Sequence, residues 1–149
     1  MKRIDETDRL QSLIDRCFRL ADEARRRGDT PVGSLLVGAD GEIVAEASER
    51  NRTEDLFAHA ELLAIEAAVK LLQNNDLKGF TLVTTNEPCF LCSYAVRQTR
   101  ISRVIFAIET LGTGGYSSNY PILAADDIGH WGPAPEILKA TELLPPNAK

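Results

Sequence analysis

Apolar residues recur at intervals of three and four along the first part of the chain. Between residues 8 and 27, acids and arginines separate Leu10, Leu13, Ile14, Cys17, Phe18, Leu20, Ala21 and Ala24. This spacing places the apolar side chains on one stripe of an amphipathic helix, with Cys17 as a small core residue. Residues 61–72 are apolar on more than one side and predict a largely buried helix. Residues 90–99 predict a third, shorter helix.

Strand signals occur in five short segments. Residues 35–37 and 43–47 flank the pair Asp40-Gly41, a combination typical of a hairpin. Residues 81–85 and 104–108 are rich in β-branched side chains and predict buried strands, and residues 136–138 predict a last edge strand. Because helices separate the later strands, these are expected to run parallel. The chain is expected to form one α/β domain over residues 1–149.

Composition and charge narrow the function classes. The 149 residues contain 17 Lys and Arg against 22 Asp and Glu, a formal net charge of −5. This balance argues against a protein that binds phosphate backbones, because such binding depends on clustered Lys and Arg. The first residues lack the apolar run of a signal peptide or membrane helix, so we expect a cytoplasmic protein without a membrane partner. Three cysteines are too few for a disulfide framework.

Candidate chemistry is concentrated in two short motifs. Cys89 and Cys92 are three residues apart with Pro88 directly before them, and His59 precedes Glu61 by two residues. A Cys-x-x-Cys pair alone could be a redox pair, and a lone His-x-Glu means little. Together they supply three zinc ligands, and catalytic zinc sites keep three protein ligands where structural sites keep four. Glu61 could itself bind the metal, but a proton-transfer role suits it better.

The two motifs resemble the H-x-E…P-C-x-x-C signature of the zinc nucleoside and nucleobase deaminases. The similarity extends over roughly residues 21–115 and includes segments that resemble bacterial tRNA adenosine deaminases and the related guanine and cytosine deaminases. It rests on the segments Pro31-Val32-Gly33-Ser34-Leu35-Leu36-Val37, Ala58-His59-Ala60-Glu61 and Thr85-Asn86-Glu87-Pro88-Cys89. The resemblance implies a three-layer α/β/α sandwich around a mixed five-stranded sheet, the cytidine deaminase-like fold. It also implies a homodimer with one Zn²⁺ per chain.

The resemblance further implies hydrolytic loss of ammonia from an amino-substituted heterocycle. His59, Cys89 and Cys92 would hold the zinc, and Glu61 would move protons between water, a ring nitrogen and the departing amine. In relatives, an asparagine upstream of the His-x-Glu contacts the base or ribose. Asn51 matches it, although the intervening loop is about three residues shorter here than in the tRNA enzymes. A plain turn residue is the alternative for Asn51.

The C-terminal part departs from these relatives. The helix that grips the anticodon loop in tRNA enzymes is not expected here. The acidic residue with which guanine deaminases meet the purine edge has no clear counterpart, although Asp126 or Asp127 could replace it. Proteins bind a flat heterocycle by aromatic stacking and by hydrogen bonds to the edge of its ring. In the loop of residues 111–135 the side chains suited to such contacts, and so the substrate-binding candidates, are Tyr116, Asn119, Tyr120, His130 and Trp131.

These departures favour a small substrate, a free base, nucleoside or analogue, and water as the reaction partners. On this prediction the protein acts in purine or pyrimidine metabolism, and nucleic acid is not an expected partner. For His130 and Trp131 the alternative is a packed C-terminal loop or a dimer contact. The competing hypotheses are tRNA adenosine-to-inosine editing and a non-catalytic zinc-bearing interaction module.

Overall fold

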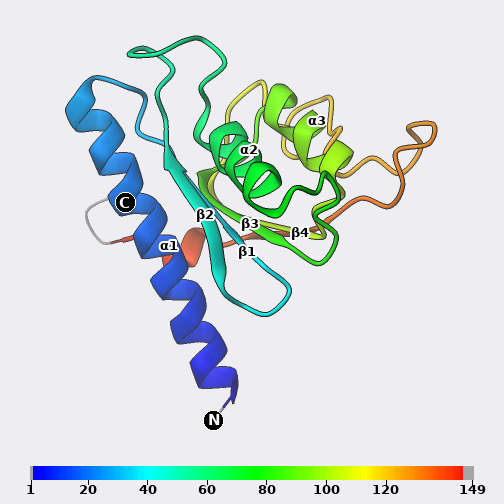
Figure 1. The fold of residues 1–149 in the computed structure, drawn as a ribbon, viewed down its shortest axis with the longest axis horizontal. Helices are drawn as coiled ribbons and strands as arrows, with labels where there is room; N and C mark the ends of the chain where they lie inside the picture. The colour runs from blue at the N-terminus through cyan, green and yellow to red at the C-terminus, as the bar shows by residue number, and fades with distance from the viewer. Residues whose placement is uncertain (1, 146–149) are drawn as a thin grey trace.

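The protein folds around one five-stranded mixed sheet (Figure 1). The computed structural model describes residues 2–145, with side chains from residue 6 onward. The strands are β1 (Gly33–Val37), β2 (Ile43–Ser48), β3 (Thr81–Asn86), β4 (Arg103–Ile108) and β5 (Glu136–Lys139). Their order in the sheet is β2-β1-β3-β4-β5. β1 runs antiparallel to β2 and β3, whereas β3, β4 and β5 run parallel, as expected for β3 and β4.

Helices cover both faces of this sheet and make the three layers that the resemblance implies. The helices are α1 (Lys2–Arg27), α2 (Ala60–Leu72) and α3 (Phe90–Thr99), followed by the short 3₁₀ helix η1 (Thr141–Leu143). α1 lies on one face and α2 with α3 on the other (Figure 1). Within the described residues, no helix has the length and apolar character needed to cross a membrane.

Alternating side chains of the strands form a core on each face. Leu36, Leu82, Val104 and Phe106 pack with residues of α2 and α3 such as Ile65 and Val96. Leu35, Val37, Val83 and Ile105 point the other way and pack with Leu13, Ile14 and Cys17 of α1. Cys17 is fully buried, as the helical stripe predicts. This two-sided burial explains the continuous apolar runs in the sequence of these strands.

The start of α1 and the connection from β4 to β5 differ from what the sequence pattern alone predicts. α1 begins at Lys2, six residues before the predicted start at residue 8, and its first turns extend beyond the sheet (Figure 1). Acidic side chains such as Glu6 favour the N-terminal turns of a helix, which periodicity alone does not register. The connection from β4 to β5, residues 109–135, contains turns and no helix.

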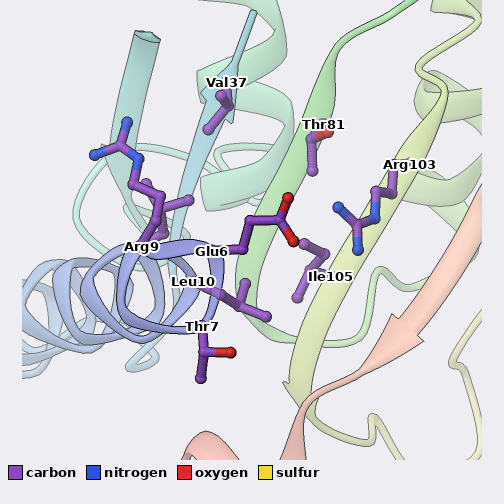
Figure 2. A pocket seen from close by; sticks show the side chains of 9 residues that line it. Glu6, Thr7, Arg9, Leu10, Val37, Thr81, Arg103 and Ile105 are labelled. Carbon is purple, nitrogen blue, oxygen red and sulfur yellow. The ribbon is translucent and has the colours of Figure 1, made fainter. Parts of the chain in front are cut away.

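A cavity of about 460 Å³ lies between the first turns of α1 and the sheet. Figure 2 shows Glu6 of α1 and Arg103 of β4 extending into it, beside Thr81 and Ile105. Thr81 and Arg103 are the first residues of β3 and β4, while the zinc-ligand candidates Cys89 and Cys92 follow the last residue of β3. The cavity therefore lies at the opposite end of the sheet from the candidate active site.

Candidate active site

Three candidate metal ligands meet where α2 and α3 begin. His59 is the N-cap residue of α2, Cys89 is the N-cap residue of α3, and Cys92 lies in the first turn of α3. Nδ1 of His59 lies 3.6 Å from Sγ of Cys89 and 3.4 Å from Sγ of Cys92. Both sulfurs also lie close to the positive N-terminal end of α3, which favours thiolates.

This arrangement fits a tetrahedral zinc ion. With ordinary Zn–N and Zn–S bond lengths, nitrogen and sulfur ligands of such an ion are about 3.6 Å apart. One imidazole and two thiolates are also the donor types that zinc prefers over calcium or magnesium. The structure therefore brings together the three residues that the sequence predicts as ligands. Three protein ligands leave one coordination position for water, as in catalytic zinc sites.

The two cysteines are electrostatically unequal. A hydrogen bond from the Cys92 thiol lowers the pKa of Cys89 to about 5, although burial opposes this shift. The same bond to Cys89, together with burial, raises the pKa of Cys92. The lowered pKa favours the thiolate form of Cys89 at neutral pH. Binding of a metal ion would then displace a proton from Cys92.

Glu61 is buried beside these ligands in the first turn of α2, with 4% of its surface exposed. Burial raises the pKa of its carboxyl to about 8. A bound dication would favour the charged form and lower this pKa again. Among the described residues, the group that could hold a metal contains His59, Cys89 and Cys92 and does not include Glu61. The geometry thus favours proton transfer, rather than ligation, as the role of Glu61.

A second buried acid, Glu49, supports the start of α2. It follows β2 directly, and its Oε1 accepts a hydrogen bond of 2.6 Å from the backbone N–H of Ala60. Burial raises the pKa of Glu49. The side chain of His59, the N-cap residue, accepts no hydrogen bond from the N-terminal N–H groups of α2. The Glu49 carboxylate accepts one of them instead. The bond joins residues 11 positions apart, and no local sequence signal identifies it.

Asn51 lies in the loop after Glu49, and its amide group contacts Thr30. Its Nδ2 donates to Oγ1 of Thr30 at 2.9 Å, and its Oδ1 accepts from the Thr30 backbone N–H at 3.2 Å. Buried Asp29 holds the following residues by accepting hydrogen bonds from the backbone N–H groups of Arg52 and Thr53. Asn51 thus helps to fix its own loop, and its contact with substrate stays a prediction.

Acid should release this loop through Asp29. Burial alone would raise the pKa of Asp29, but the hydrogen bonds from Thr53 and Arg52 outweigh it and lower the pKa from 3.8 to about 2. A pKa that is lower in the folded state gives stability above the unfolded pKa, and this stability is lost as pH falls from about 4 to about 2. Asp29→Asn should therefore lower the melting temperature at pH 7 and leave it nearly unchanged at pH 2. Thermal denaturation at both pH values tests this, with exposed Asp40→Asn as the control; an equal loss at both would contradict it.

The first half of the 111–135 loop lies beside the metal ligands. Gly114 forms an isolated β-bridge with Cys89, and the Gly115 N–H donates to the Pro88 carbonyl at 2.8 Å. The ring of Tyr120 stands edge-on to Phe90, the residue after Cys89, with centroids 6.1 Å apart. Tyr116 and Asn119 are exposed in the same segment. The contact with Phe90 places Tyr120 beside Cys89, whereas the ring of Tyr116 packs edge-on against Phe106 of β4. Contacts of Tyr116, Asn119 and Tyr120 with substrate stay predictions.

The second half of the loop follows the C-terminal part of α3. Trp131 packs edge-on against Tyr94, and the guanidinium of Arg97 lies 5.2 Å from its ring centre. Buried Arg97, which the sequence did not single out, donates to the carbonyls of Ile122, Ala125 and Gly132. His130, Asp126 and Asp127 are exposed. This packing favours a structural role for Trp131, while its contact with substrate and that of His130 stay predictions.

Comparisons with known proteins show the family of the chain. The profile of the cytidine and deoxycytidylate deaminase zinc-binding region matches residues 7–108. A tRNA-specific adenosine deaminase of Aquifex aeolicus is 39% identical over 133 residues, which are 85% of each chain. The chain spans only 22% and 24% of two Deinococcus proteins named tRNA(Ile)-lysidine synthase, from Deinococcus radiodurans and Deinococcus deserti.

Solved structures give the same result for the fold. A structure from a study of A-to-I editing by tRNA:A34 deaminases is 28% identical, with a TM-score of 0.77 over 87% of this chain and 97% of that chain. The guanine deaminase of Bacillus subtilis is 36% identical, with a TM-score of 0.62 over 66% of this chain and 63% of that chain. With its zinc-ligand geometry and its matching profile, the chain belongs to the cytidine and deoxycytidylate deaminase family of zinc-binding hydrolytic deaminases.

Proposed function

We propose that the protein removes the exocyclic amino group of an adenine-type base by hydrolysis, and that this base is an adenosine in tRNA. The observation that carries the deaminase chemistry is the buried Glu61 carboxyl beside the three-ligand cluster of His59, Cys89 and Cys92. The tRNA substrate is supported by the name and the 39% identity of the Aquifex aeolicus relative. This ranking replaces the small-molecule substrate that the sequence analysis placed first.

In this reaction the base exchanges its amino group for an oxygen from water, and ammonia leaves. A Zn²⁺ held by His59, Cys89 and Cys92 supplies a Lewis acid that lowers the pKa of water toward 7. Glu61 accepts the proton that water loses as its oxygen bonds to the amino-bearing carbon. It passes this proton to the ring nitrogen, then takes the second proton from the newly bonded hydroxyl and gives it to the departing amine, which leaves as ammonia. Its burial keeps bulk water away from these transfers.

A small aminopurine is the second candidate, because the rim of the site lacks basic residues on one side. No Lys or Arg occurs between Thr110 and Tyr120, the half of the loop that lies beside the metal ligands. Phosphate backbones are bound mainly by Lys and Arg. On the other side, Arg52 is exposed, while Arg50 pairs with Glu54 at 3.4 Å. This charge distribution favours an uncharged substrate over RNA.

Ammonia and inosine measurements decide between the two candidates. We expect inosine in an anticodon stem-loop that carries adenosine, with a rate that falls steeply as salt increases. The matched substrates are free adenine, guanine, adenosine and cytosine, and Glu61→Gln serves as the blank. Ammonia from a free base without inosine in the stem-loop would instead establish the second candidate. A protein that deaminates none of these substrates would contradict both.

The homodimer stays a proposal. Exposed apolar side chains on α3 and in the loop before α2 offer a surface for a second copy, namely Leu91, Tyr94, Leu56 and Phe57. A monomer mass in solution by light scattering would contradict it.

A further inference from the structure

Glu87 is a buried acid between β3 and the zinc-ligand candidate Cys89, and only 1% of its surface is exposed. Its Oε2 accepts hydrogen bonds of 2.7 Å from the backbone N–H groups of both Tyr116 and Ser117. Its Oε1 accepts from the Thr110 N–H at 3.0 Å and from the Ser117 hydroxyl at 2.6 Å. One carboxylate thus holds both ends of the segment from Thr110 to Ser117.

The glycines of this segment permit the close approach to Glu87. A Cβ atom at Gly114 would collide with the Glu87 carboxylate, and one at Gly115 would collide with the Ser93 hydroxyl. Neither glycine has a positive φ, so space rather than backbone conformation requires glycine here. Gly114 therefore allows the segment to lie against this carboxylate, and Gly115 allows it to lie against Ser93 of α3.

The backbone of Glu87 is tied to the same segment. Its N–H donates to the carbonyl of Ile108 at 2.8 Å, and its carbonyl accepts from the Thr110 hydroxyl at 2.6 Å. Two residues further on, Cys89 bridges to Gly114. The segment therefore contacts the backbone at Glu87 and at the zinc-ligand candidate Cys89.

We propose that Glu87 is a positioning residue: it holds the segment 110–117 so that Tyr116 and the following residues to Tyr120 form the rim against which the base is bound. This inference rests on the proposed deaminase function for its substrate, but the anchoring itself does not. The acceptor geometry requires a carboxylate. An amide at this position would turn one acceptor into a donor that faces donors from Tyr116 and Ser117 or from Thr110.

Glu87→Gln tests the proposal through amide hydrogen exchange in the zinc-loaded protein. The peptide covering residues 110–118 should exchange about tenfold faster or more than in the wild type, because its amides lose their acceptor. Zinc content should stay at one per chain. In the deaminase assay KM should rise about tenfold, with kcat changed by less than about threefold, since a mobile rim weakens binding of ground state and transition state alike.

Glu109→Gln is the matched control. It makes the same chemical change at the residue between Ile108 and Thr110, but the Glu109 carboxylate pairs with Lys139 at 2.8 Å and accepts none of the hydrogen bonds that Glu87 accepts. It should leave both exchange and KM unchanged. Ser117→Ala removes only the hydroxyl that donates to Glu87 at 2.6 Å. It should shift exchange and KM in the same direction by a smaller factor, which keeps the proposal testable if Glu87→Gln fails to fold.

Unchanged exchange in residues 110–118 of Glu87→Gln would overturn the anchoring. Faster amide exchange in Glu87→Gln with an unchanged KM would overturn the positioning role. A Glu87→Gln variant that loses zinc and has a lower kcat at constant KM would also overturn it. The exchange measurement needs no substrate. A wild type without deaminase activity would therefore refute the proposed function separately, while faster exchange in the variant would still support the anchoring.

Discussion

Glu61→Gln is expected to lower kcat for deamination by about 10²–10⁴-fold, the usual contribution of a positioned acid or base. The substitution keeps the shape of the side chain and removes its ability to accept and return a proton. Because Glu61 is not part of the His59, Cys89 and Cys92 cluster, zinc content should stay at one per chain. Ammonia release and metal analysis on the same preparation measure both quantities.

Glu66→Gln provides the control for this prediction. Glu66 lies on the same helix, α2, and is exposed. The change in charge is the same, so deamination by Glu66→Gln should match the wild type. Undiminished ammonia release by Glu61→Gln would contradict the mechanism. A wild type that releases no ammonia from any substrate would instead favour the alternative of a zinc-bearing interaction module.

Cys92→Ala is expected to remove zinc and to destabilise the fold. Loss of one of three ligands should weaken zinc affinity by about 10²-fold or more. Through mass action this corresponds to roughly 3 kcal/mol of stability at saturating zinc, or a fall in melting temperature of roughly 5–10 °C. A chelator should lower the melting temperature of the wild type toward that of Cys92→Ala and have little effect on the variant. Metal analysis and thermal denaturation with and without chelator test this.

Cys17→Ala separates loss of the metal from loss of packing. Cys17 is fully buried on the opposite face of the sheet, against α1. Its replacement leaves a small cavity and should cost some stability, but zinc should stay at one per chain and the chelator should act as on the wild type. A full complement of zinc in Cys92→Ala would show that the ligand set is wrong.

Much of the site was predictable because its chemistry is local in sequence. Cys89 and Cys92 share one helical turn, and His59 and Glu61 share another, so each pair is placed by its own helix. The fold was predictable for a related reason, since side chains buried on both sides give apolar runs in the strands. The helix start at Lys2 was missed because its first turns have no apolar stripe.

The residues that hold the site in place could not be found in this way. Glu49 contacts Ala60 across 11 positions, Glu87 contacts Tyr116 across 29, and Arg97 reaches Ala125 across 28. Each is an ordinary charged residue in the sequence, and only the folded chain makes it a buried partner. Its burial and its contacts arise together, because a charged group is tolerated inside a protein only where hydrogen bonds satisfy it.

The sequence by itself determined the reaction class and the α/β architecture, and it was enough to predict the three zinc-ligand candidates and a proton-transfer role for Glu61. These depend on residue types and spacings that a helix or strand converts directly into geometry. The tertiary structure decided which half of the 111–135 loop borders the site, how Asn51 is held by Thr30, and which buried acids anchor the two loops. Those features depend on contacts between segments far apart in the chain, and such contacts exist only after the sheet and its helices have packed together.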